Sequence, residues 1–190
     1  MNQAQPKWSL DEYLDWEGKQ PERNFYYRGE IFAMVAVRQA HAQVTLNLGA
    51  AFKSVLRGTP CRAFVADMKL RIDAADAVFY PDVMVSCDAR DRATPLWLAH
   101  PKLIVEVLSD STAAFDRGAK FAACRLIDTL EEYALIDIDA RRTEVFRRNA
   151  EGRWVLYEFI GDEPVEFQSI GVTIDAATLY ENVEDVSEAQ

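Results

Sequence analysis

Two short apolar runs, each holding one carboxylate, most strongly constrain how this chain can fold. Asp82 lies in residues 80–85 and Glu106 lies in residues 103–108. Runs of β-branched and aliphatic residues of this length are typical of strands buried on both faces. A buried carboxylate is costly to ionise unless a cation, a metal ion or hydrogen-bond donors compensate its charge. We therefore expect both acids inside a sheet, beside a compensating group.

Lys120 follows Glu106 on the segment expected to form the helix that leaves this strand. A helix beginning near Thr112 rises about 1.5 Å per residue, so its first turns run back along the strand. Asp82 and Glu106 offer the oxygen ligands that Mg²⁺ (magnesium) or Mn²⁺ prefers, and the carbonyl of Val107 could add another. An ammonium there would orient a water molecule or neutralise a phosphate. The pattern favours metal-dependent phosphodiester hydrolysis.

The plainer alternative is a structural role for both acids. A buried Asp or Glu can cap a loop or pair with an arginine. Lys120 also stands four residues after Asp116, the spacing of an ordinary ion pair on a helix. Under this alternative the three residues stabilise the fold and carry no chemistry.

The chain has 190 residues, of which 49% are hydrophobic, and can bury one full core. We expect a single domain over residues 1–190, with residues 181–190 forming a disordered acidic tail. No apolar run approaches the roughly 20 residues that cross a membrane. Residues 1–7 lack the basic-then-apolar plan of a signal peptide, so the expected location is the cytoplasm without a membrane partner.

The three cysteines, Cys61, Cys87 and Cys124, form no C-x-x-C pair. Zinc ribbons and thioredoxin-like motifs are therefore not supported. Buried, reduced thiols are the expected state, in agreement with a cytosolic location.

The formal net charge of -10, with a pI near 4.7, argues against nucleic-acid binding. Proteins that bind polyanions usually present a basic field. Part of the acidity is confined to the expected tail, and basic residues cluster at 141–142 and 147–148. The global charge thus weakens the case for a nucleic-acid partner without excluding such a partner.

The order of expected elements predicts an α/β fold. Ser9 and Glu12 form a capping-box pattern that opens a helix over about 9–17. The elements expected after it are a hairpin (25–34), a helix (40–57), strands (62–72, 78–87 and 102–108), a helix (112–127), a strand (132–137), a β meander (143–147, 154–160 and 165–168) and a short helix (175–180). We expect a central mixed sheet flanked by helices, with a C-terminal antiparallel β meander.

These motifs together resemble the PD-(D/E)XK, restriction-endonuclease-like superfamily. More narrowly, nearly the whole chain resembles the Uma-two family of endonucleases. The resemblance is carried by residues 27–31, His41, and residues 67–71, 80–83, 103–109, 116–121 and 132–133. It implies the restriction-endonuclease-like fold and a metal-dependent nuclease whose catalytic residues are Asp82, Glu106 and Lys120.

One position departs from the superfamily's commonest pattern. Leu108 stands two residues after Glu106, where the D/E-X-K triplet has its lysine. The resemblance implies that Lys120 substitutes from the helix.

Four further positions are candidates for supporting roles. His41 matches a family position and is a candidate substrate-side or base residue, although a histidine at a helix start is often a surface or capping residue. Glu30 is either a hairpin charge or a supporting acid. Asp67 could equally pair with the basic residues of its own strand. Tyr133 could be a core residue whose hydroxyl lies near Lys120.

Two classes of function stay open at this point. The first is a divalent-metal-dependent nuclease acting on nucleic acid, with DNA as the expected substrate and a homodimer as the expected assembly. The second is a binding or interaction protein that keeps the fold with a weakened site. A serine or zinc hydrolase is not supported, because neither G-x-S-x-G nor H-E-x-x-H occurs.

Overall fold

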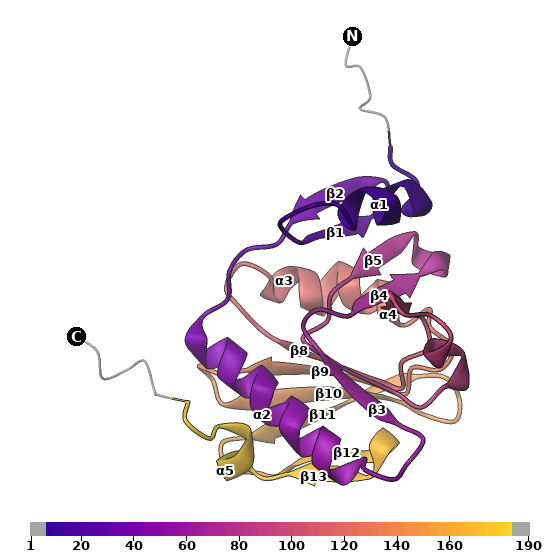
Figure 1. Cartoon of the computed structure of the whole chain (residues 1–190). Helices are drawn as coiled ribbons and strands as arrows, with labels where there is room; N and C mark the ends of the chain where they lie inside the picture. Colours follow the sequence, from indigo (N-terminus) through magenta and orange to yellow (C-terminus); the bar gives the residue numbers. More distant parts are fainter. Residues whose placement is uncertain (1–6, 184–190) are drawn as a thin grey trace, which may run out of the picture.

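The computed structural model describes residues 7–183, which form two large β-sheets and a separate two-stranded sheet, with helices against them (Figure 1). The larger sheet has the order β11-β10-β9-β8-β6-β3. Its strands in chain order are β3 (Arg62–Val65), β6 (Val83–Ser86), β8 (Leu103–Val107), β9 (Glu132–Asp137), β10 (Arg142–Arg148) and β11 (Trp154–Ile160). β8 and β9 are parallel and the other neighbours are antiparallel, so the expected mixed central sheet is confirmed.

The smaller sheet has the order β2-β1-β5-β4-β7. Its strands are β1 (Asn24–Tyr27), β2 (Glu30–Ala33), β4 (Lys69–Ile72), β5 (Ala77–Phe79) and β7 (Trp97–Leu98). β1 and β2 form the expected hairpin, and Arg28 and Gly29 both have positive φ in its turn. Helix α1 (Leu10–Glu17) begins with the expected Ser9–Glu12 capping box and packs beside β1.

The two faces of the larger sheet contact different helices. Helix α2 (Gln39–Val55) crosses one face, together with the hairpin of β12 (Val165–Phe167) and β13 (Val172–Ile174) and the short helix α5 (Ala176–Leu179). The other face packs against α3 (Ala113–Phe115), a π-helical turn (Asp116–Lys120) and α4 (Phe121–Cys124), with the smaller sheet beyond. The expected helix over 112–127 is therefore interrupted by a wide turn at its centre.

A hydrophobic core lies on each face of the larger sheet, and the alternating direction of the β8 side chains decides which core Glu106 enters. Leu103, Val105 and Val107 belong to the core under α2, whereas Ile104 belongs to the core between the two sheets. Because successive side chains of a strand point to opposite faces, Glu106 shares the face of Ile104. The carboxylate therefore points toward the helix that carries Lys120.

Two segments expected as single strands are each divided between the two sheets. Residues 62–72 form β3 and β4, and residues 78–87 form β5 and β6. Ala66, with a φ of 51°, turns the chain out of β3. Pro81 interrupts the second segment because it has no N–H to continue a ladder. Asp82 therefore lies at a crossing between the sheets and not inside a strand, which corrects the expectation from its apolar run.

The C-terminal meander is confirmed for two of its three strands. β10 and β11 pair in register over seven residue pairs, but β12 pairs with β13 and not with β11. The buried carboxylate of Glu132 explains this difference. It accepts hydrogen bonds from the backbone N–H of Gln168 (3.1 Å) and of Ser169 (2.9 Å), and from Arg147 Nε (2.8 Å). The chain after β12 is thereby attached to the start of β9, away from β11.

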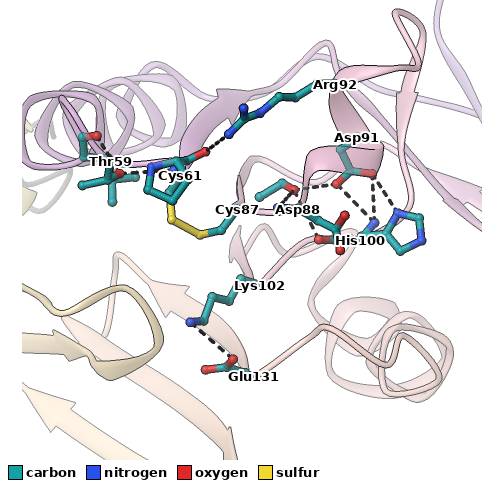
Figure 2. The surroundings of a disulfide bond; sticks show 12 residues. Thr59, Cys61, Cys87, Asp88, Asp91, Arg92, His100, Lys102 and Glu131 are labelled. Atoms are coloured by element: carbon teal, nitrogen blue, oxygen red, sulfur yellow. Dashed lines mark hydrogen bonds and ion pairs between the residues drawn. A yellow bond between two sulfur atoms is a disulfide. The ribbon is translucent and has the colours of Figure 1, made fainter.

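A disulfide joins Cys61 and Cys87, so the expectation of three reduced thiols was wrong for this pair (Figure 2). Arg62 pairs with Ser86 in the β3–β6 ladder, which places the two cysteines opposite each other just beyond it. Cys124 is free and buried, as expected. Beyond Ser86 the loop is held by Asp91, whose carboxylate accepts a hydrogen bond from the Ser86 hydroxyl at 2.6 Å.

Part of the expected acidic tail is packed against the domain. Asn47 Nδ2 donates a hydrogen bond to the carbonyl of Glu181 at 2.9 Å, and Val183 packs against the core under α2. Residues 184–190, the remainder of that tail, lie outside the described part of the chain. Within residues 7–183, no helix has the length and apolar character needed to cross a membrane.

The neighbouring residues Glu131 and Glu132 give a matched test of the buried contacts that Glu132 makes with Arg147 and with the chain after β12. Glu132→Gln leaves Arg147 buried with only a 3.9 Å pair to the half-exposed Glu166. We expect a loss of about 3–5 kcal/mol in unfolding free energy, the scale for breaking a buried ion pair. Glu131→Gln removes an ion pair with Lys102 in which the carboxylate is 53% exposed, and the expected loss is at most about 1 kcal/mol. Urea unfolding of both variants measures the difference. Equal losses would contradict the role assigned to Glu132.

Candidate active site

The principal candidate residues meet at a cavity of about 320 Å³. Asp82 comes from the crossing before β6, Glu106 from β8 and Lys120 from the π-helical turn. His41, in the first turn of α2, and Asp116 also line it. Residues far apart in the sequence are thus brought together where the two sheets and two helical segments meet.

Asp82 is oriented by contacts to both of its carboxylate oxygens. Oδ1 lies 2.8 Å from His41 Nε2, and Oδ2 accepts a hydrogen bond from the Val107 N–H at 2.8 Å. The N–H of Asp82 in turn donates to Glu106 Oε2 at 3.4 Å. The crossing and β8 are therefore connected directly through the two acids. Val107 contacts Asp82 through its N–H and not through its carbonyl. The role of that carbonyl as a metal ligand therefore stays a prediction.

Lys120 reaches both acids on its side of the cavity. Its Nζ lies 2.8 Å from Glu106 Oε1 and 3.2 Å from Asp116 Oδ1. The π-helical turn holding Lys120 is of a kind frequent at functional sites. The Tyr133 hydroxyl donates a hydrogen bond to the Asp116 carbonyl at 3.0 Å, which ties the turn to β9. Lys120 is thus held by the backbone around it as well as by its ion pairs.

The electrostatics of the cluster are dominated by burial and by an excess of acid. Burial raises the pKa of Glu106 well above its ordinary value; Lys120 opposes this rise, and Asp116 and Asp82 add to it. Burial alone would lower the pKa of Lys120, but Glu106, Asp116 and Asp82 outweigh that effect and raise it. Lys120 is therefore a cation. Asp82, Glu106 and Asp116 thus place three carboxyl groups around one ammonium.

A divalent cation fits this donor set. Glu106 Oε1 is buried and accepts no aligned hydrogen bond, although Lys120 lies at ion-pair distance. Over residues 7–183, no three His, Cys, Asp or Glu side chains gather in the manner of an all-protein metal cage. Mg²⁺ rarely uses such a cage, because it keeps several waters and is held by one or two carboxylates and by substrate phosphates. Asp82 and Glu106 are the residues that would supply those two carboxylates.

The supporting candidates divide into two groups. His41 lines the cavity and contacts Asp82, and Tyr133 lies behind the turn of Lys120 with its side chain in the core. Glu30 is exposed on β2 and does not line the cavity. Asp67 is also outside it, with a side chain that is 71% exposed and forms an ion pair with Arg23. The structure therefore brings only His41 and Tyr133 near the candidate site.

Asp116 is the member of the cluster that sequence reasoning missed. Its spacing to Lys120 indicated only an ordinary helical ion pair, yet its side chain is buried and lines the cavity. The signal available in the sequence was this same four-residue spacing between Asp116 and Lys120. It becomes decisive only once the second sheet is seen to cover this helix.

The chain is similar to proteins from Synechocystis sp. and Anabaena variabilis. It is 34% identical over 175 residues to the uncharacterized protein slr1290 of Synechocystis sp., covering 92% of each chain. It is 34% identical over 159 residues to the uncharacterized protein sll1609 of the same organism, covering 82% of this chain and 90% of the other. A crystal structure from Anabaena variabilis, described as a putative nuclease belonging to DUF820, matches with a TM-score of 0.75 at 20% identity.

The Anabaena match covers 91% of this chain and 97% of the other, and confirms the expected fold. Residues 10–177 match the family Uma2, described as "Putative restriction endonuclease". That range contains every residue of the buried cluster. Since the match spans most of the sequence, this chain belongs to the Uma2 family.

Proposed function

We propose that this protein is a divalent-metal-dependent nuclease that hydrolyses phosphodiester bonds of nucleic acid, with DNA as the expected substrate. The observation that carries the proposal is the position of Lys120, which lies 2.8 Å from Glu106 and beside Asp82 at one cavity. Membership of a family described as "Putative restriction endonuclease" supports the same reaction class.

In this proposal Asp82 and Glu106 hold Mg²⁺ or Mn²⁺. When bound, the cation supplies Lewis-acid stabilisation of the phosphate and activation of a water molecule. Lys120 stays protonated, so its role is to donate hydrogen bonds and to neutralise charge on the phosphate rather than to accept a proton. His41 fixes the orientation of Asp82 through its 2.8 Å contact.

The alternative is a binding or interaction protein that keeps the fold with a weakened site. The observation that favours it is the closeness of the buried ion pairs, because Lys120 already contacts both Glu106 and Asp116 without a metal ion. The net charge of -10 also favours this alternative, because nucleic-acid-binding proteins usually present a basic field. The two functions predict different effects of replacing Lys120 on nucleic-acid cleavage.

Replacement of Lys120 separates catalysis from structure. We expect Lys120→Met to lower the turnover of nucleic-acid cleavage with Mn²⁺ by about 10²–10³-fold, the scale of losing one electrostatic donor. Lys120→Arg should recover little, because a guanidinium fork does not fit the place of a compact ammonium. Lys102→Met, at a half-buried lysine paired with Glu131 outside the cavity, is the matched control.

Cleavage and folding are measured on the same samples, by oligonucleotide cleavage and by circular dichroism. A folded Lys120→Met variant that cleaves at the wild-type rate would remove Lys120 from the mechanism. Wild-type protein that binds the metal but cleaves neither DNA nor RNA would favour the alternative function.

We also propose a homodimer formed through the edge strand β11. The N–H of Asn149 donates to the carbonyl of Arg153, and the N–H of Gly161 donates to the carbonyl of Arg141. The register places residues 155, 157 and 159 in the same phase. The N–H groups of Trp154, Leu156 and Glu158 therefore point to the free edge. Val155, Leu156, Tyr157 and Ile160 are exposed. An antiparallel second copy centred on Tyr157 would use all seven residues of the strand.

A charge on this edge tests the dimer. We expect a dimeric mass for the wild-type protein by light scattering at micromolar concentration, and a monomer for Leu156→Lys, because lysine on an edge strand opposes pairing. Leu96→Lys, at an exposed leucine in the loop before β7, should stay dimeric. A monomeric wild-type protein, or a dimeric Leu156→Lys variant, would contradict this interface.

The proposal keeps the cytoplasm as the location, since nucleic acid is present there. The Cys61–Cys87 disulfide argues against that location, because cytoplasmic thiols are held reduced. The bond lies beyond the end of the β3–β6 ladder opposite to Asp82, so its opening leaves the carboxylate cluster in place.

A further inference from the structure

The groups that would act on the phosphate lie at the bottom of the cavity. The side chain of Glu106 is 2% exposed and that of Lys120 is 10% exposed. Asp82, nearer the opening, is 21% exposed. A phosphate that meets all three must therefore enter the cavity and cannot be cleaved at the protein surface.

The size of the cavity limits what can accompany that phosphate. Its volume of about 320 Å³ lies at the lower end of the range for small-ligand sites, roughly 300–1,000 Å³. In a duplex, each nucleotide is paired and stacked, and it must leave the stack before a narrow pocket can take it. A nucleotide that is already unpaired avoids this cost.

The walls of the cavity suit a base better than a row of phosphates. One wall is an apolar strap, residues 34–37, which connects β2 to α2 and is exposed along its length. Val35 in this strap is 67% exposed. Phe25, Phe79 and Phe115 line the cavity, with Phe115 packed 5.3 Å from Phe25 and 5.8 Å from Phe79 between ring centres. Bases stack on aromatic and apolar side chains whatever their sequence.

The charges around the cavity are unsuited to a long duplex contact. Arg38, His41 and Lys120 are the basic residues among the described residues that line it, and each contacts an acid. Arg38, for example, lies 2.9 Å from Asp139. Duplex binding relies on several cations that neutralise successive phosphates. Contact with a base would have to supply much of the affinity here.

We propose that the cavity receives an unpaired nucleotide, with its base against the strap and the phenylalanines, so that the substrate is single-stranded or flap-containing nucleic acid and not intact duplex. This proposal rests on the nuclease function proposed above. It adds the class of substrate, which neither the carboxylates nor the lysine specify.

Cleavage of three matched substrates tests the proposal. One labelled sequence is presented with Mn²⁺ as a single strand, as a blunt duplex and as a single-stranded flap on a duplex. We expect the single strand and the flap to be cut at least about 10-fold faster, with the cuts in unpaired nucleotides. A duplex cut as fast as the single strand would overturn the substrate class and leave the nuclease function intact.

Binding without metal gives a readout that does not need activity. Val35→Asp places a charge on the strap, and Val55→Asp makes the same change at a 55% exposed valine at the end of α2, outside the cavity. Fluorescence anisotropy of a labelled single strand should show affinity lowered about 10-fold by Val35→Asp and little changed by Val55→Asp. Equal effects of the two variants would overturn the proposal even if cleavage is absent.

Discussion

The buried ion pairs of Lys120 with Glu106 and Asp116 are the interaction on which the site depends. They join β8, the π-helical turn and, through the N–H of Asp82, the crossing between the two sheets. Removal of one partner from such a cluster leaves an uncompensated buried charge. The cluster also places three carboxyl groups beside one ammonium, and carboxylate oxygens are ligands that a divalent cation prefers. Structure and proposed chemistry thus share the same residues.

How much the sequence predicts depends on whether a signal is local. The capping box of Ser9 and Glu12 and the turn of Arg28 and Gly29 each involve residues that are close in the sequence. The helix and the hairpin that they predict are both present. Asp82 and Glu106 stood out because acids in apolar runs need compensation. The division of residues 62–72 and 78–87 between two sheets depends on which strands pair at a distance, and no local pattern specifies that pairing.

The same reasoning explains the features that sequence analysis missed. Cys61 and Cys87 become neighbours only because β3 pairs with β6, so their spacing along the chain gives no sign of a disulfide. Asp116 becomes a buried member of the site only because the smaller sheet covers its helix. The acidic net charge, which argued against a nucleic-acid partner, is compatible with a substrate whose base binds the apolar walls of the cavity, because little phosphate neutralisation is then required.

Metal binding by the carboxylate cluster is the central claim, and calorimetric titration of Mg²⁺ and Mn²⁺ into the purified protein tests it most directly. The account predicts binding to the wild-type chain, and affinity lowered by more than about 10-fold in Asp82→Asn and in Glu106→Gln, the scale of loss seen even for residues that only support metal ligands. Circular dichroism shows whether both variants stay folded. Unchanged affinity in the two folded variants, or a wild-type protein that binds neither ion, would contradict the account.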